Sequence, residues 1–204
     1  MQDLSVVPFF LFMDKLKLDR IFDVLFTVLF FALLVGVPLI FTSYTRSVFE
    51  VNKLLWLRII TLLVFFLWFF KYLLYRDNGF YSNSKNTIRI FSFKWQKTGL
   101  EFPILLVFVS NALSTIFSQN IRLSIIGSYD RWEGIITVVM YMMLFLMFSK
   151  LITKKFQLHW AILGIIIPTC FSGFYGILQH FGKDFMHWSQ DPMRRVFACI
   201  NNPV

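Results

Sequence analysis

Long apolar runs separated by short polar segments make up most of this 204-residue chain. A run of about 18 or more apolar residues is long enough to cross a bilayer as a helix. The pattern predicts spans at about residues 21–42, 54–75, 102–117, 134–151 and 158–180, of which the third is short. We therefore expect an all-α protein, a polytopic transmembrane helical bundle of about five spans.

The spans divide the chain into three parts. Residues 1–20 hold a short apolar patch, "SVVPFFLF", interrupted by Pro8 and followed by "DKLKLDR". The patch has no basic segment before it and no small-residue cleavage site after it, so it does not read as a signal peptide. We expect a cytoplasmic or interfacial N-terminus over 1–20, a transmembrane domain over 21–180 and an outer-face tail over 181–204.

Two basic residues, Arg58 and Lys71, lie within the predicted second span, each about one turn from an end. Long basic side chains at such positions commonly extend toward the lipid headgroups. We expect this of both residues. For Arg58 the alternative is a functional arginine that faces inward.

Composition supports the membrane class, because 57% of the residues are hydrophobic and soluble domains contain fewer. The net charge of +9 could suggest a nucleic-acid partner. The basic residues, however, fall mostly in short loops between apolar runs, where they act as topology signals. We therefore expect a lipid bilayer and no nucleic acid as the partner of this surface.

Lys and Arg are distributed unequally between the two sides of the predicted bundle. The N-terminal side carries Lys15, Lys17, Arg20, Lys71, Arg76, Lys85, Arg89, Lys94, Lys97, Lys150, Lys154 and Lys155. The opposite side carries Arg46, Lys53, Arg122, Arg131, Lys183, Arg194 and Arg195. Because cytoplasmic loops are enriched in basic residues, the N-terminus is predicted to be cytoplasmic.

The segment "SIIGSYDRWEG", residues 124–134, would then lie on the outer face. Gly127 and Gly134 permit tight backbone turns, and the forked guanidinium of Arg131 fits phosphate oxygens. The alternative is a turn at headgroup level, in which Arg131 pairs with Asp130 or Glu133. Both interpretations place the segment at the membrane surface.

The tail on the same face contains the adjacent Arg194 and Arg195, followed by the turn-forming "NNP". The alternative is an ordinary loop that enters a further span. The cysteines and histidines, Cys170, Cys199, His159, His180 and His187, show no metal-ligand spacing, so we expect no metal site.

These two segments resemble motifs of the O-antigen ligase and O-antigen polymerase family of bacterial membrane glycosyltransferases. A pattern S-x-x-G-x-x-x-R-x-x-G is matched by Ser124, Gly127, Arg131 and Gly134. A second pattern, G-x-x-Q-x-x-G followed by a Trp, an arginine and R-x-x-G-T-x-x-N-P-N, is matched by Gly176, Gln179, Gly182, Trp188, Arg195, Asn202 and Pro203. The departures are Ala198 for glycine, Cys199 for threonine and Val204 for the final asparagine. The resemblance covers residues 100–204, and residues 1–100 only in hydropathy.

The resemblance implies a GT-C-like enzyme in the bacterial inner membrane, with its motif loops on the periplasmic face. Its donor would be a glycan on undecaprenyl diphosphate, and its acceptor a glycan or lipid A core; no cofactor is implied. The substrate-binding candidates, in order, are Arg195, Arg131, Arg194 and Arg122. Gly127, Gly134, Gln179, Asn202 and Pro203 would be structural motif positions. Arginines of this kind would stabilise the diphosphate leaving group.

The family's large outer loop and its histidine normally lie beyond the length of this chain. We therefore expect the chain to be the N-terminal part of a longer protein, with the catalytic residue beyond Val204 and the fragment inactive alone. The alternative functions are a transporter or flippase-like protein for a lipid-linked sugar or small anion, and a non-catalytic membrane scaffold. Transporters place charges near the bilayer midplane, whereas Arg58 and Lys71 lie near the ends of their span.

Overall fold

The computed structural model describes the backbone of residues 6–41, 50–75, 87–90, 93–96, 99–128, 131–184, 196 and 198–199. In this part of the chain the elements are α1 (Val6–Leu39), α2 (Glu50–Tyr75), β1 (Thr87–Ile90), β2 (Phe93–Gln96), α3 (Glu101–Ile116), α4 (Ile121–Ile126), α5 (Ile135–Leu151) and α6 (Lys155–His180). The predicted helical class is confirmed.

The connection between α2 and α3 contains a structure that the all-α expectation missed. Strands β1 and β2 pair in antiparallel register, with Thr87 opposite Gln96 and Ile90 opposite Phe93. Both strands are rich in β-branched and aromatic residues, which favour extended backbone. The two strands are short and lie within a polar stretch of the sequence, so the pattern there predicted only a connection.

Within the described ranges, three helices are long and apolar enough to cross a membrane: Lys17–Leu39 within α1, Glu50–Leu74 within α2, and α6. They indicate a membrane protein. Two of the predicted spans correspond to shorter apolar helices, Phe102–Ile116 and Ile135–Leu151. Helix α1 also begins well before the predicted span, at Val6, so residues 6–20 continue the same helix.

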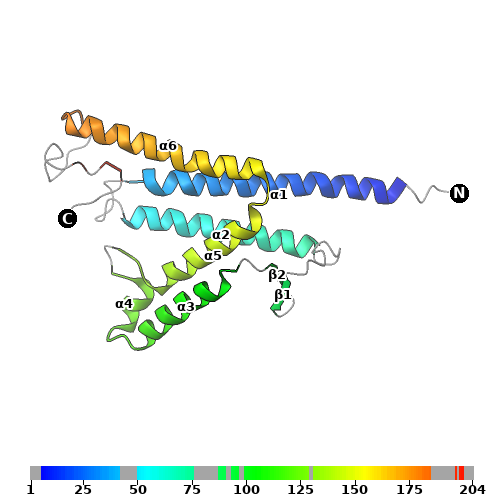
Figure 1. Cartoon of the computed structure of the whole chain (residues 1–204), viewed down its shortest axis with the longest axis horizontal. Helices are drawn as coiled ribbons and strands as arrows, with labels where there is room; N and C mark the ends of the chain where they lie inside the picture. The colour runs from blue at the N-terminus through cyan, green and yellow to red at the C-terminus, as the bar shows by residue number, and fades with distance from the viewer. Residues whose placement is uncertain are drawn as a thin grey trace.

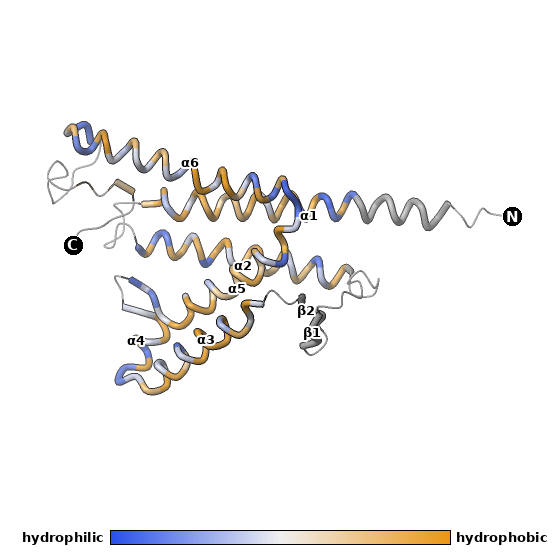
Figure 2. The backbone as a smooth tube through the Cα atoms, viewed as in Figure 1, coloured by the Kyte–Doolittle hydropathy of each residue, from blue (hydrophilic) through white to orange (hydrophobic). Residues whose placement is uncertain are grey.

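Successive long helices run in opposite directions, as the colour sequence in Figure 1 shows. Helices α1, α2 and α6 lie side by side, with α1 in contact with both others. Helices α3 and α5 form a hairpin closed by α4, and this hairpin packs on α2 through α5. Hydrophobic residues extend along every long helix, and hydrophilic residues gather toward the helix ends (Figure 2).

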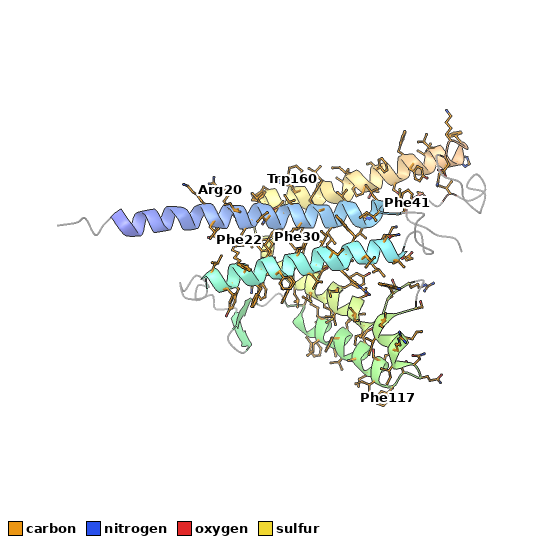
Figure 3. All side chains as sticks on the ribbon, turned by 180° about the vertical axis from the view of Figure 1, so that it is seen from behind. Arg20, Phe22, Phe30, Phe41, Phe117 and Trp160 are labelled. Carbon is orange, nitrogen blue, oxygen red and sulfur yellow. The ribbon has the colours of Figure 1, made fainter. Side chains whose placement is uncertain are left out.

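The buried core lies mainly between α1 and α2. Its residues recur every three or four positions on each helix, which is the spacing of one helix face. They are Phe22, Phe26, Phe30 and Leu33 of α1 and Leu57, Ile60, Val64 and Trp68 of α2, and Met147 of α5 packs with them. Figure 3 shows Phe22 and Phe30 between α1 and α2. The outward faces are apolar as well, since Val28, Phe66 and Ile165 are more than half exposed. A lipid environment accounts for both faces being apolar.

An ionic cluster joins the three candidate spanning helices near the start of α6. The Lys71 ammonium lies 3.2 Å from the Asp19 carboxylate and 3.6 Å from that of Asp23. Asp23 also pairs with Lys154, and its backbone carbonyl accepts from the Gln157 side chain at 3.4 Å. The Lys71 side chain is only 19% exposed. It pairs with carboxylates on α1, and its extension toward the lipid headgroups stays a prediction.

Candidate functional site

Both motif segments lie at one end of the molecule. This end, here called the motif end, is formed by the C-terminal ends of α1 and α6, the N-terminal end of α2 and the turn between α4 and α5 (Figure 1). Phe41, which follows α1, stacks on Tyr175 of α6 with ring centroids 6.2 Å apart. The ionic cluster lies toward the opposite end.

The first motif segment is a turn that closes on itself. Asn120 caps α4 by accepting a 3.2 Å hydrogen bond from the Leu123 amide, and α4 ends at Gly127, whose φ is +94°. A Cβ on Gly127 would collide with the backbone of Trp132 and Glu133, and one on Gly134 with the carbonyl of Ile125. The two glycines therefore allow the two sides of the turn to cross in direct backbone contact.

Arg131 lies in this turn with an exposed side chain, and Arg122 is exposed on α4. The Arg131 amide donates to the Ser128 carbonyl at 3.2 Å, and the Trp132 amide donates to the same oxygen at 2.7 Å. Among the described residues, Arg131 forms no ion pair with Glu133; Asp130, its other expected partner, lies outside them. Within the described residues, the Arg131 side chain is thus exposed at the surface and unpaired with Glu133.

Arg58 of α2 faces inward and contacts the same turn. Its Nη2 atom donates to the Trp132 carbonyl at 3.0 Å and to the Thr137 hydroxyl at 2.7 Å. The Thr137 hydroxyl donates in turn to the Trp132 carbonyl at 2.8 Å, and the guanidinium lies 5.4 Å from the centre of the Trp132 ring. The inward-facing alternative for Arg58 is therefore the one that the structure favours.

The second motif segment folds back onto α6. Gln179 is fully buried; its side chain accepts a 2.8 Å hydrogen bond from the Ala198 amide and donates one of 2.9 Å to Asp184. Tyr175 donates to the other oxygen of Asp184 at 2.8 Å. A Cβ on Gly176 would lie 3.2 Å from Val196 and 3.5 Å from Ala198. The motif residues Gln179 and Gly176 therefore contact Ala198 and Val196 directly.

Ala198 stands where the family pattern has glycine, and its φ is +45°. Left-handed backbone of this kind favours glycine, so alanine is strained here. The next residue, Cys199, is fully buried, and its carbonyl accepts a 2.6 Å hydrogen bond from Lys53 of α2. Burial raises the pKa of the Cys199 thiol, against smaller opposing effects of a hydrogen bond with Ser172 and of the Lys53 charge.

The structure does not describe the remaining candidates. Arg194, Arg195, Asn202 and Pro203 lie outside the described residues. The pairing of Arg195 with Arg131 therefore stays a prediction. Among the described residues, no group of three or more His, Cys, Asp and Glu side chains is arranged to hold a metal ion.

An open groove of about 720 Å³ runs along α6 at the motif end. Its lining comes mainly from residues of α6, among them Thr169, Gly173, Gly176 and His180, and includes Pro38 of α1 and Val196. Apart from His180 and the hydroxyls its lining is apolar. The groove can accept a hydrocarbon chain beside the second motif segment.

Sequence reasoning missed two features of the described structure. Asp23 falls inside the predicted first span, and a carboxylate there requires a partner; this signal could have identified the pairs with Lys71 and Lys154. The sequence pattern gives Lys53 only the role of a topology charge, and nothing in its sequence neighbourhood indicates the carbonyl of Cys199 as its partner.

Comparison of the chain with protein-family models, with curated proteins and with solved structures finds no match in any of the three.

Proposed function

We propose that the protein is a membrane glycosyltransferase of the O-antigen ligase and polymerase type. It would transfer a glycan from an undecaprenyl diphosphate carrier to a glycan or lipid A core acceptor at the outer face of the bacterial inner membrane. In this proposal five helices cross the membrane in a GT-C-like bundle, the N-terminus is cytoplasmic and the motif end faces the periplasm.

The observation that carries the proposal is the position of the two segments that resemble the family's motifs. They are separated by α5 and α6, yet both lie at the motif end. Within each segment, the residues that match the pattern make the turn: Gly127 and Gly134 in the first, Gln179 in the second. Spacing that matches by chance would not be expected to coincide with such contacts.

The chemistry of this end suits a lipid diphosphate. Departure of the diphosphate develops negative charge, which preorganised guanidinium groups stabilise. Arg131 and Arg122 are exposed at the motif end, and Arg195 is the further arginine that the resemblance assigns. The apolar groove along α6 supplies a place for the hydrocarbon chain of the donor. The motif end thus carries exposed arginines in the first motif segment and, on the other side of α2, an apolar groove along α6, and a lipid diphosphate requires both kinds of surface.

Gene deletion with complementation tests this proposal. We expect deletion to remove or shorten the surface polysaccharide of the native host, and wild-type protein to restore it. Arg131→Ala and Arg195→Ala should fail to restore it, and Arg131→Lys should restore it poorly, because lysine cannot bind phosphate bidentately. The matched control is Arg20→Ala, an exposed arginine away from the motif end. Normal polysaccharide with both Arg131→Ala and Arg195→Ala would contradict the proposal.

One observation favours the second candidate, a transporter of a lipid-linked sugar or small anion. Asp19, Asp23 and Lys71 form a largely buried ionic cluster between candidate spanning helices, and ionisable groups within membranes often line transport pathways. Asp23→Asn separates the two functions. The substitution destabilises the protein in either case, so activity is compared per amount of folded protein: a transporter would lose translocation, whereas a glycosyltransferase would keep its transfer activity.

A further inference from the structure

Helix α2 lies between the two halves of the motif end. It contacts α1, which carries α6 on its other side, and it contacts α5, which carries the hairpin. Two cations on α2, Lys53 and Arg58, are five positions apart. On a helix this separation corresponds to a rotation of roughly 140° and a rise of roughly 7.5 Å. The two side chains therefore leave α2 toward different neighbours.

Each cation binds one motif segment. Lys53 donates to the carbonyl of Cys199 at 2.6 Å, and Arg58 donates to the carbonyl of Trp132 at 3.0 Å. Both acceptors are backbone carbonyls, so each cation fixes the course of the chain. These charge-assisted hydrogen bonds are stronger than neutral ones.

The two contacts occur at the two strained places of the described backbone. Among the described residues, the non-glycine residues with positive φ are Trp132 at +52° and Ala198 at +45°. Arg58 binds the carbonyl of Trp132 itself, and Lys53 binds the carbonyl of the residue that follows Ala198. Such conformations persist only where surrounding contacts determine them. Both strained turns are thus held by the same helix.

Each strained residue adjoins or belongs to a motif. Trp132 follows Arg131 directly, so the strained backbone at Trp132 belongs to the same turn as the exposed Arg131. Ala198 occupies the glycine position of the second pattern. Neither Lys53 nor Arg58 belongs to a pattern of the family, and their region resembles it only in hydropathy.

We propose that Lys53 and Arg58 are a pair of positioning residues, through which α2 holds both motif segments in their strained turns. Only the purpose of this positioning depends on the proposed function: it would present Arg131 and the arginines of the tail to one anionic ligand. The positioning itself is a property of the described contacts.

Two reporters already present in the chain can follow the two turns separately in detergent-solubilised protein. Trypsin cleavage after Arg131 requires the first turn to open, and reaction of the buried Cys199 with a maleimide requires the second to open. Mass spectrometry distinguishes Cys199 from the exposed Cys170, and cleavage after Arg131 from cleavage elsewhere.

We expect Arg58→Ala to accelerate cleavage after Arg131 by about tenfold, the order of effect expected for loss of a charged hydrogen bond, and to leave Cys199 labelling unchanged. We expect Lys53→Ala to do the reverse. The conservative variants Arg58→Lys and Lys53→Arg should restore most of the protection. Ile59→Ala, which truncates the exposed neighbour of Arg58 on α2, is the matched control and should change neither rate.

Two results would overturn the proposal. One is that cleavage after Arg131 in Arg58→Ala and labelling of Cys199 in Lys53→Ala both stay within twofold of the wild-type rate. The other is an equal increase at both reporters in either variant, which would indicate general loosening of the bundle. Neither measurement depends on a glycan. If both Arg131→Ala and Arg195→Ala leave surface polysaccharide normal while the crossed pattern holds, the proposed function fails and the positioning stands.

Discussion

The guanidinium of Arg58 donates a 3.0 Å hydrogen bond to the carbonyl of Trp132, 74 positions further along the chain. This contact joins a helix outside the family patterns to the residue beside Arg131, the exposed arginine of the first motif segment. The conformation of that segment therefore depends on a part of the chain where the resemblance is only hydropathic.

The orientation of the motif end can be tested by thiol labelling of intact cells. Ser128 is exposed in the first motif segment, and Lys155 is exposed at the start of α6, toward the opposite end. In a Cys170→Ser background, Ser128→Cys should react with a membrane-impermeant maleimide in intact cells, and Lys155→Cys only after lysis. Cys199 is buried and contributes little background. The reverse pattern would overturn the assignment of the motif end to the periplasm.

The glycines of the first motif segment should tolerate no side chain. Because a Cβ on Gly134 would collide with the Ile125 carbonyl, we expect Gly134→Ala to destabilise the protein by about 1–3 kcal/mol through overpacking. Gly127→Ala adds strain, because its φ is +94°. The measurement is thermal unfolding in detergent.

Gly173→Ala is the control for this prediction, since nothing lies within 4 Å of the position that a Cβ would take on this residue of α6. Its melting temperature should equal that of wild type or exceed it slightly, because alanine favours helix. If Gly134→Ala and Gly173→Ala have the same melting temperature, the turn is not closed in the way described.

The sequence could predict the features that depend on neighbouring residues, and it could not predict contacts between residues far apart along the chain. Apolar runs located the long helices within a few residues, except at the start of α1, because membrane insertion depends on local hydropathy. The turn at Gly127 and Gly134 was also readable, because glycine allows close backbone contact. The partners of Lys53, Arg58 and Asp23 lie far away along the chain, and only the packing of helices brings them together.

The ionic cluster gives a prediction that concerns stability alone. Asp23→Asn removes the partner of Lys154 and one partner of Lys71. Breaking a buried pair from one side leaves a charge uncompensated and costs about 3–5 kcal/mol; the partial exposure of Lys154 reduces this. A double-mutant cycle with Lys71→Met should show coupling, whereas one with Arg20→Ala should be additive. Additivity with Lys71→Met would contradict the cluster.

The buried thiol of Cys199 provides a pH-dependent prediction. Burial raises the pKa of this thiol, so the neutral form stabilises the fold fully below the usual thiol pKa. That contribution is lost as the pH rises through the higher pKa of the folded protein. Labelling of Cys199 should therefore continue to accelerate at pH values where an ordinary cysteine has reached its maximal rate.

Gln179→Leu should weaken the burial of Cys199, because it removes the acceptor of the Ala198 amide. An unsatisfied buried amide costs about 1–3 kcal/mol, so labelling should be roughly tenfold faster at neutral pH. A variant that labels at the wild-type rate would show that Gln179 does not hold the second motif segment.

The most direct test of the central claim is consumption of a lipid-linked donor by native membranes. Membranes of the native host with an unaltered gene should convert an undecaprenyl-diphosphate-linked glycan to transferred glycan and free lipid diphosphate. Membranes with Arg131→Ala should do so at a rate lower by about two orders of magnitude, the usual effect of removing a group that stabilises developing charge, and Arg20→Ala should match wild type. Equal consumption by wild-type, Arg131→Ala and gene-deleted membranes would contradict the account.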